Sequence, residues 1–407
     1  MSTWVTKTLA EVSSIYNGGT PDTKVKEYWG DEIFWITPKD MGKLDGINVY
    51  NTERKLTVKG LKNSSAKVLP VNSVILSSRA PIGHLAINKI EICTNQGCKG
   101  IVPSSQLDTS FLYYFLKSSV DLLNSLGTGT TFKELSAKKL GEVLIPFPSL
   151  KEQKRIVSIL DEAFAAIDKA KENAEKNLKN ARELFESYLT SIYEGQLKNT
   201  VNLSSVAEIA SGYSFKSNEF KPLGNYQVLR IGNVKPGLIR KEESPIFISD
   251  VSEAILGKAL LQINDVVITQ TGTKKKRDYG YTAIVDSNGY LLNQRVARIR
   301  FSKGYLAKYF LYYSWTDLFK DQFFANENGT VGQGNVGIGA ITNASVPNSS
   351  LTQQKEVVQL VDELRNAITR IEDVYKQKLK SLEELKKSIL QKAFTGELTS
   401  KRIPQLA

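Results

Sequence analysis

Leu150-Lys151-Glu152-Gln153-Lys154-Arg155-Ile156-Val157 returns 201 residues later as Leu351-Thr352-Gln353-Gln354-Lys355-Glu356-Val357-Val358. The match continues without a gap, so that residues 150–197 align with residues 351–398, and 16 of the 48 aligned positions are identical. An ungapped match of this length is hard to obtain by chance, even between two unrelated amphipathic helices. The sequence therefore predicts an internal tandem repeat, in which each copy is one structural unit.

The segments that precede the two copies also correspond, although insertions and deletions shift the offset between 192 and 201 residues. The matched pairs are Leu9–Gly18 with Leu203–Gly212, Leu69–Ile75 with Leu261–Val267, Asn95-Gln96 with Asn293-Gln294, and Tyr114–Leu116 with Tyr309–Leu311. We therefore expect four regions. They are a first variable domain (1–148), a central helical region (149–198), a second variable domain (199–347) and a distal helical region (348–407).

Both repeated segments have the residue spacing of a long amphipathic helix. Neither Pro nor Gly occurs within Lys151–Tyr193, and apolar residues recur every three or four positions in Ile156–Ile192 and in Val357–Ile389. Gly195 and Gly396 follow as expected C-terminal caps. Each helix would have about 45 residues and a length of about 65–70 Å. Because a single apolar stripe must be covered, we expect the two helices to pair as an antiparallel coiled coil. The alternative is that each helix packs separately on its own domain.

The two variable domains contain short β-branched and aromatic runs that are broken by Gly, Asn and Pro. The runs that we interpret as strands include Glu32–Ile36, Ser73–Leu76, Val228–Ile231 and Asp265–Ile268. Helical stretches are expected near Phe111–Leu126 and Tyr305–Phe324. The expected fold class is α+β, with two strand-rich α/β domains separated by two long helices.

Charge and composition narrow the class of protein further. The 407 residues carry a formal net charge of +12, which favours a polyanionic partner. No apolar run is long enough for a transmembrane helix, and the first residues lack the apolar core of a signal peptide. Cys93, Cys98 and the single histidine, His84, are too few for a structural zinc site. We expect reduced thiols in a cytoplasmic protein.

Polar and cationic loops follow the predicted strands of both domains. Thr269–Arg277 contains four consecutive cations, and Gly127–Lys133 and Gly329–Asn335 are matching polar glycine loops. Lys, Arg and glycine backbone N–H groups suit phosphate oxygens, whereas Gln pairs with adenine and Arg with guanine. The alternative is that these loops are solvated surface turns. The residues that we expect to bind DNA are Ser78, Arg79, Thr128, Thr130, Lys133, Arg230, Asn233, Gln270, Thr271, Lys274, Lys275, Lys276, Arg277, Gln333 and Asn335.

Several motifs suggest catalysis but lack the required context. Gly332–Gly337 fits G-x-G-x-x-G, yet a cofactor fold needs it between a strand and a helix. Here we expect an Ala/Ile/Thr strand and then Pro347. Pro21-Asp22 with Glu53–Lys55 spells a nuclease-like pattern that the second repeat lacks. The chain contains neither the Asn-Pro-Pro-aromatic motif of adenine methylases nor a P-loop. We expect no catalytic, cofactor-binding or metal-binding residues.

The chain resembles the specificity (S, HsdS) subunit of type I restriction–modification systems over essentially its whole length. The segments that carry the resemblance are Pro146–Lys154 and Pro347–Lys355, Ile-Val-x-x-Leu-Asp at 156–161 with its second copy, and Tyr193–Leu197 and Phe394–Leu398. The repeated order of these segments makes the resemblance specific.

The resemblance implies that each variable domain is a target recognition domain, which reads one half of a gapped double-stranded DNA target. It implies that the helical regions bind two modification (methylase) subunits, which supply S-adenosylmethionine and adenine-N6 methylation. Restriction subunits would add translocation and cleavage that depend on ATP and magnesium, and this chain would catalyse nothing. The base-reading residues of the family vary, so none is carried over. The alternatives are a coiled-coil scaffold without DNA specificity and a self-sufficient DNA-modifying enzyme.

Overall fold

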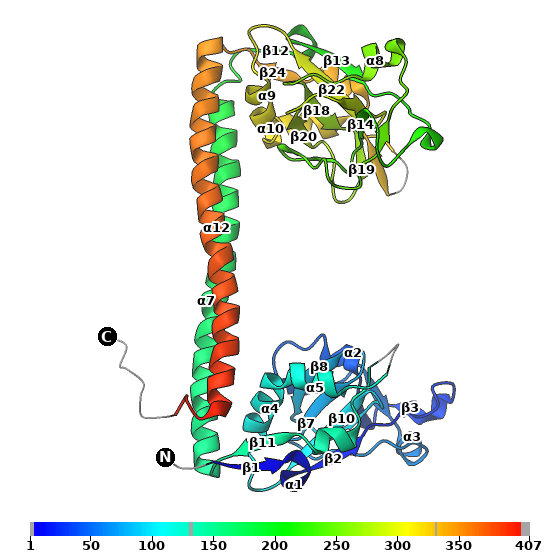
Figure 1. The fold of residues 1–407 in the computed structure, drawn as a ribbon, viewed down its shortest axis with the longest axis vertical. Coiled ribbons are helices and arrows are strands. Elements are labelled where there is room, and N and C mark those ends of the chain that lie inside the picture. Colours follow the sequence, from blue (N-terminus) through cyan, green and yellow to red (C-terminus); the bar gives the residue numbers. More distant parts are fainter. Residues whose placement is uncertain (1–3, 130–132, 330–331, 400–407) are drawn as a thin grey trace. The chain divides into compact units, whose positions relative to one another are not determined.

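The computed structural model of the chain describes residues 4–129, 133–329 and 332–399. Contacts divide the chain into two compact units: unit 1 comprises Met1–Ala174 and Gln377–Ala407, and unit 2 comprises Glu175–Lys376. Each unit contains one variable domain and part of each long helix, α7 (Leu150–Glu194) and α12 (Leu351–Thr395) (Figure 1). The contact-based division therefore passes through both helices instead of following their ends.

The domain of unit 1 is built on a five-stranded sheet with the order β2-β10-β7-β8-β5. These strands are β2 (Ser13–Asn17), β10 (Cys98–Pro103), β7 (Val74–Ser78), β8 (Ile82–Asn88) and β5 (Asn48–Val49). A four-stranded sheet contains β3 (Trp29–Gly30), β6 (Arg54–Leu56), β4 (Ile33–Ile36) and β9 (Ile92–Thr94), and β1 (Val5–Thr8) pairs with β11 (Leu144–Phe147). The helices are α1 (Leu9–Val12), α2 (Pro38–Met41), α3 (Val58–Lys62), α4 (Thr109–Ser118), α5 (Val120–Leu126) and α6 (Ala137–Gly141).

The domain of unit 2 repeats this plan with a sheet in the order β13-β22-β18-β20. These strands are β13 (Ala207–Ser211), β22 (Val296–Phe301), β18 (Val266–Thr269) and β20 (Thr282–Ile284). The smaller sheets contain β17 (Phe247–Ile248), β14 (Tyr226–Leu229) and β21 (Tyr290–Leu292); β15 (Val234–Lys235) and β16 (Leu238–Ile239); β19 (Thr271–Thr273) and β23 (Gln333–Asn335); and β12 (Thr200–Asn202) and β24 (Ser345–Pro347). The helices are α8 (Glu253–Ala259), α9 (Ala307–Tyr313), α10 (Asp317–Ala325) and α11 (Ile338–Thr342).

The two sheets share their register as well as their order. Val74 lies opposite Ile101 in unit 1, and Val266 lies opposite Ile299 in unit 2. The turns before β7 and β18 place Asn72 and Asn264 at left-handed φ values of 66° and 72°, a conformation that Asn tolerates better than most residues. The tandem repeat predicted from the sequence is therefore confirmed in the pairing of individual residues.

Three details differ from the sequence expectations. Residues 338–342 form helix α11 and not an Ala/Ile/Thr strand, because they repeat α6 of the first domain and end at the same kind of short strand. Tyr114 corresponds to Tyr312 and not to Tyr309, since each bonds the equivalent aspartate of its long helix. The error is one helical turn, a shift that an apolar helix pattern does not resolve. Of the two glycines that follow α7 and α12, Gly396 alone has a positive φ, of 83°.

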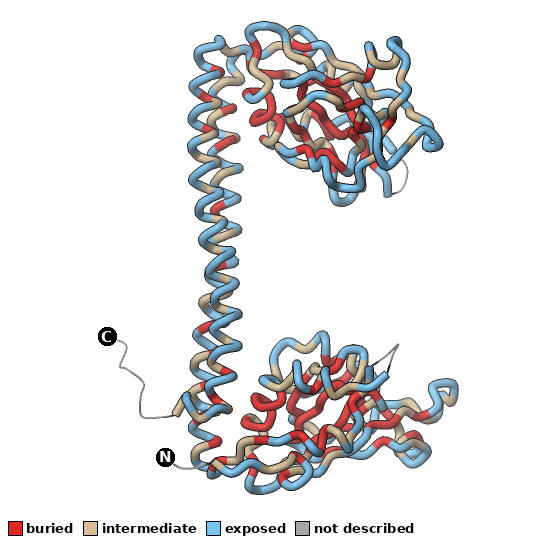
Figure 2. Tube along the Cα trace, in the orientation of Figure 1, coloured by how far each residue is buried: buried red, intermediate tan, exposed pale blue. Residues whose placement is uncertain are grey.

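Each domain core is completed by residues from both long helices. In unit 1, Ile156 and Leu160 of α7 and Leu390 and Ala393 of α12 join the cluster around Phe111. In unit 2, Leu189 and Tyr193 of α7 and Val357 and Val361 of α12 join the cluster around Phe310. Figure 2 shows buried residues gathered inside each domain. Residues from both long helices are therefore structural parts of each domain core.

The two helices run antiparallel in both units, as expected. In unit 1, Asp168 accepts a bond from Lys386 at 2.8 Å, and Lys171 contacts Glu383 at 2.7 Å. The residue number on α12 thus falls as the number on α7 rises. In unit 2, the side chain of Asn177 donates to Tyr375 Oη at 3.1 Å, and Arg182 Nε contacts Glu372 at 2.6 Å.

A buried side chain explains why Gln recurs near the start of both long helices. Gln153 is fully buried, and its Nε2 donates to Pro148 O at 2.9 Å and to Gln106 O at 3.1 Å. Its Oε1 accepts the backbone N–H of Asp108 at 2.8 Å. The corresponding bonds of Gln354 reach Ser349 O at 2.8 Å, Gly304 O at 3.0 Å and Leu306 N at 2.8 Å. One side-chain amide therefore connects the start of each long helix to a loop in the domain before it. In unit 1 this loop precedes α4, and in unit 2 it precedes α9.

We predict that Gln153→Ala destabilises unit 1 by about 1–3 kcal/mol, because it leaves buried backbone groups without partners. The measurement is urea unfolding of the full chain, followed by hydrogen exchange at Asp108 N–H, which should become faster. Gln391→Ala, on the exposed face of α12 in the same unit, is the matched control. Equal unfolding midpoints for the two variants would contradict the anchoring role.

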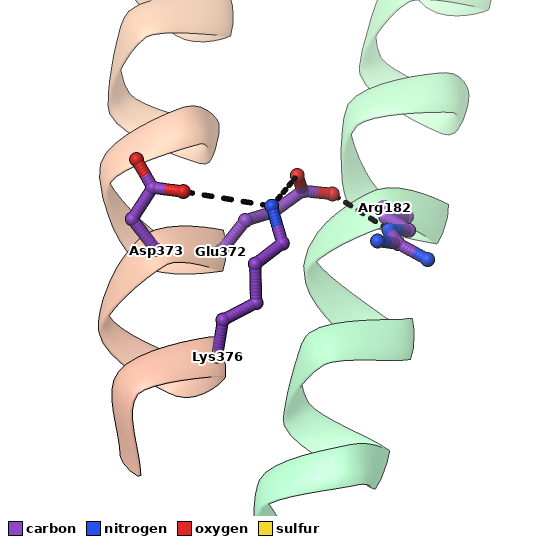
Figure 3. Close-up of polar contacts among 4 residues, drawn as sticks. All are labelled: Arg182, Glu372, Asp373 and Lys376. Atoms are coloured by element: carbon purple, nitrogen blue, oxygen red, sulfur yellow. Dashed lines mark hydrogen bonds and ion pairs between the residues drawn. The ribbon is translucent and has the colours of Figure 1, made fainter. Parts of the chain in front are cut away.

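Glu372 is the centre of a charged group between the helices of unit 2 (Figure 3). Its carboxylate accepts bonds from Arg182 of α7 and, at 3.3 Å, from Lys376 of α12. The Arg182 hydrogen bond lowers the pKa of Glu372 from its ordinary value of 4.5. The unfolded chain therefore takes up this proton more readily than the folded one. The stabilisation is complete above the ordinary pKa and is lost as the pH falls through the lowered one.

We predict that Glu372→Gln costs about 0.2–1 kcal/mol near neutral pH and that the difference from the native chain disappears as the pH falls below the lowered pKa of Glu372. The measurement is the unfolding midpoint of both proteins across this range. Asp373→Asn is the control, since Asp373 bonds Lys376 of its own helix at 3.5 Å. A difference that persists in acid would show that the contribution does not come from the Glu372 charge.

Candidate nucleic-acid interface

A tight turn before β22 presents two exposed side chains in unit 2. Asn293 O accepts the N–H of Val296 at 2.9 Å, and Asn293 Oδ1 accepts the N–H of Gln294 at 2.7 Å. Gly212 packs so closely against the turn that a Cβ at this position would lie 1.9 Å from Asn293 O. Gln294 and Arg295 remain exposed at the tip. The backbone of the turn is therefore fixed while its side chains face solvent.

Unit 1 contains the same turn before β10. Asn95 O accepts the N–H of Cys98 at 2.9 Å, and Asn95 Oδ1 accepts the N–H of Gly97 at 2.7 Å. A Cβ on Gly18 would lie 1.9 Å from Asn95 O. Gln96 is exposed and hydrogen-bonds Thr20. The repeated Asn-Gln dipeptide thus marks one turn that occurs in both domains.

The glycine loop lies beside the strand that follows β18. Strands β19 and β23 form a two-stranded antiparallel ribbon, in which Thr271 pairs with Asn335 and Thr273 with Gln333. Unit 1 reproduces this contact in a shorter form, where Arg79 and Thr128 both bridge to Glu134. In each domain the fold therefore brings the polar loop after the central strand beside the glycine loop, two segments that the sequence interpretation treated as separate candidates.

A hollow of about 410 Å³ lies between the ribbon and the turn of unit 2. The residues that line it are Thr271, Gln294, Arg295, Gly329, Gln333 and Asn335. Thr271 Oγ1 is buried and has no hydrogen-bond partner among the described residues. The hollow therefore offers amide, hydroxyl and guanidinium groups.

The four cations Lys274–Arg277 form an exposed turn directly after β19. Lys274 N–H donates to Gly332 O at 3.3 Å, which holds this turn against the glycine loop. Arg277 lies over the ring of Phe324, with 4.7 Å from Cζ to the ring centroid. A hydrogen bond from the Thr273 backbone lowers the pKa of Asp278. This carboxylate therefore stays ionised beside the cations and partly offsets their positive charge.

Other predicted site residues have structural contacts in the folded chain. Gln270 is buried, and its side chain donates to Val336 O at 3.2 Å. Asn233 is buried and donates to Glu243 O at 2.8 Å. Arg230 donates to Ser244 O at 2.7 Å. Ser78 is buried. Ser78, Asn233 and Gln270 are therefore buried, whereas Arg230 is partly exposed and is bonded within the domain.

The remaining predicted residues lie on exposed loops or in the ribbon. Thr128 and Lys133 are exposed in unit 1, and Gln333 and Asn335 are exposed in unit 2. Thr130 lies outside the described residues. Arg79 is about one third exposed and lies 3.6 Å from Glu134, whose other oxygen lies 3.7 Å from buried Lys99. The first domain thus has an ionic cluster where the second has neutral Thr271 and Asn335.

The sequence interpretation missed Gln96, Gln294 and Arg295. All three are exposed at the turns described above. The repeated Asn-Gln dipeptide was visible in the sequence, but it served as a marker of the repeat. Its position beside the glycine loop depends on strand pairing between distant segments, which the sequence pattern does not specify.

The described part of the chain contains no cluster of three or more metal-ligating side chains and no helix suited to cross a membrane. Cys93 and Cys98 are free and buried. Burial raises the pKa of Cys93 to about 11 and that of Cys98 to about 12. Both thiols are therefore protonated near neutral pH.

A model of the type I restriction modification DNA specificity domain matches residues 1–178 and 196–383. The chain therefore belongs to this family. It is 38% identical over 187 residues to the type I restriction enzyme MjaIX specificity subunit of Methanocaldococcus jannaschii, covering 46% of this chain and 43% of that protein. The chain thus spans less than half of that relative. It is 24% identical over 424 residues to the EcoKI specificity subunit of Escherichia coli K12, covering 98% and 89%.

Two solved structures are similar in fold over nearly the whole chain. One, from work on complex assembly and conformational transition of the type I R-M system, has a TM-score of 0.76 at 18% identity and covers 98% of this chain and 99% of its own. The HsdS subunit from Thermoanaerobacter tengcongensis has a TM-score of 0.60 at 17% identity and covers 98% of each chain. At these identities the likeness establishes the fold alone.

We predict that replacing Lys274, Lys275 and Lys276 by Gln weakens DNA binding by the full chain, since phosphate contacts and counterion release are lost. The slope of log K against log salt should decrease by about 0.9 for each lost contact. The measurement is a salt titration of fluorescence anisotropy with duplex DNA. Lys258→Gln, on exposed α8, is the control. An unchanged slope in the triple variant would place this turn away from the DNA backbone.

Proposed function

We propose that the chain is a DNA-reading subunit with a bipartite double-stranded target, one half-site for each variable domain. The observation that carries this proposal is the duplicated turn and its neighbouring strand contact, which have corresponding backbone pairings but different side chains in the two domains. A common backbone suits a common duplex geometry, and different side chains suit different bases. The net charge of +12 agrees with a polyanionic partner.

The helices α7 and α12 hold the two half-sites at a fixed spacing in this proposal. Their outer faces dock two modification subunits. Exposed apolar side chains on these helices support a docking role: Leu184 and Val374 in unit 2 are more than 60% exposed, and Leu385 in unit 1 is about half exposed. Single exposed apolar residues are common, but several on paired helices suit a protein partner.

The modification subunits would carry S-adenosylmethionine and perform adenine-N6 methylation. Restriction subunits would carry ATP and magnesium and perform translocation and cleavage. This chain would contribute recognition alone. The family membership supports this division of roles, and the relatives named above are themselves called specificity subunits.

The test is sequence selection by the full-length chain, co-expressed with its modification subunit, from duplex oligonucleotides with a randomised centre. We predict two conserved half-sites separated by a gap of constant length. Replacing residues 199–347 by the second domain of another family member should change one half-site and leave the other. The matched control, replacement of residues 1–148, should change only the other half-site.

Selection of no preferred sequence would leave the coiled-coil scaffold as the better interpretation. Methylation of DNA by the chain alone with S-adenosylmethionine would instead favour the self-sufficient enzyme. Loss of both half-sites in each chimera, with folded proteins, would contradict the assignment of one half-site to each domain.

A further inference from the structure

We infer that Gln294 and Arg295 determine the sequence preference of the second domain, by reading purine edges in the major groove. This inference rests on the proposed function and names the base-reading residues of one half-site. The hollow of about 410 Å³ beside the turn is where the base edges would lie.

The side chains around this hollow are available for a ligand. Those of Gln294, Arg295, Gln333 and Asn335 make no hydrogen bond with another described residue. Thr271 Oγ1 is a buried hydroxyl without a partner, and a buried polar group of this kind is stabilised when a ligand supplies the bond. By contrast, the Gln270 amide is already bonded within the domain. Side chains without a hydrogen-bond partner in the domain can therefore read DNA, whereas side chains that are already bonded, such as Gln270, stabilise the loop.

The backbone that carries Gln294 and Arg295 is held from three directions. Asn293 closes the turn, Gly212 packs against it, and Arg295 O accepts the N–H of Gln270 at 3.0 Å. A fixed backbone limits the entropy that is lost when the side chains bind, and it sets their position relative to the ribbon. This arrangement suits discrimination between bases, which requires side chains in defined positions.

The neighbouring elements suit entry into the major groove. A two-stranded ribbon of the kind formed by β19 and β23 fits the width of this groove. The Lys274–Arg277 turn extends from the end of β19, where it can contact phosphates while the ribbon faces the bases. In Figure 1, β19 lies on the opposite side of its domain from β12 and β24, which adjoin the long helices.

The chemistry of the hollow favours purines. An Arg guanidinium pairs bidentately with guanine O6 and N7, and a Gln amide pairs with adenine N6 and N7. The side chains that characteristically accept from cytosine N4 are carboxylates, and none of the described residues that line the hollow is acidic. We therefore assign guanine to Arg295 and adenine to Gln294.

The first domain provides an internal comparison. Gly97 occupies the place of Arg295, and a Cβ on Gly97 would lie 3.2 Å from Arg79 Nε. A guanidinium therefore lies beside the turn in both domains but comes from different segments. Arg79 is paired with Glu134, whereas Arg295 has no carboxylate partner among the described residues. The two turns should accordingly prefer different bases.

The test applies the same selection from randomised duplexes to Gln294→Ala, Arg295→Ala and Arg295→Lys. Both Arg295 variants should lose preference for guanine at one position of one half-site, by about 5- to 150-fold, because Lys keeps the charge but not the planar fork. Gln294→Ala should lose an adenine in the same half-site without changing the salt dependence. Lys303→Ala, just past the far end of β22, is the matched control and should leave both half-sites intact.

The unaffected half-site reports that each variant chain is folded, and thermal unfolding provides a second check. If Arg295→Lys keeps the guanine preference while Arg295→Ala weakens binding to all sequences equally, Arg295 contacts phosphate and the inference is wrong. Two unchanged half-sites in every variant would also overturn it and leave the proposed function standing. If the native chain selects no bipartite sequence, the proposed function itself fails.

Discussion

Burial of one apolar stripe on each 45-residue helix is the constraint on which the rest of the structure depends. An isolated helix of this length with a single stripe would expose that stripe to water, so it must find a partner surface. α7 and α12 each provide the apolar surface that covers the stripe of the other. Near the helix ends the stripes join the domain cores, through Ile156 and Leu390 in one unit and through Tyr193 and Val361 in the other. Neither domain core is complete without both helices.

Buried polar groups give this apolar arrangement a defined geometry. Gln153 and Gln354 each satisfy three backbone groups, and Tyr114 and Tyr312 each bond an aspartate of the adjoining helix. Such bonds add modestly to stability, but breaking one leaves a buried group unsatisfied. The same penalty acts in both copies. That penalty accounts for Gln and Asp recurring at identical spacing while the surrounding apolar residues vary.

The interface follows the opposite pattern. Its backbone is held by close glycine packing and by the Asn-Gln turn in both domains, whereas its exposed side chains differ. One domain carries the charged Arg79–Glu134–Lys99 group, and the other carries neutral amides, a hydroxyl and a guanidinium that has no ion-pair partner among the described residues. A rigid frame with exchangeable side chains can alter what it recognises without altering how it folds.

Residue spacing alone determined the tandem repeat, the two long helices, their antiparallel pairing and the α+β class, because helix periodicity and an ungapped duplicate are local properties of the chain. Residue spacing could not determine which polar side chains are exposed to solvent. Gln270 and Gln294 are the same residue type near the same loop, yet one is bonded inside the domain and the other is exposed beside a hollow. That distinction arises from pairing between β19 and β23 and from the approach of Gly212 to Asn293, which join segments more than sixty residues apart. Only the tertiary structure decides such contacts, because burial and hydrogen bonding depend on what the rest of the chain places beside a residue.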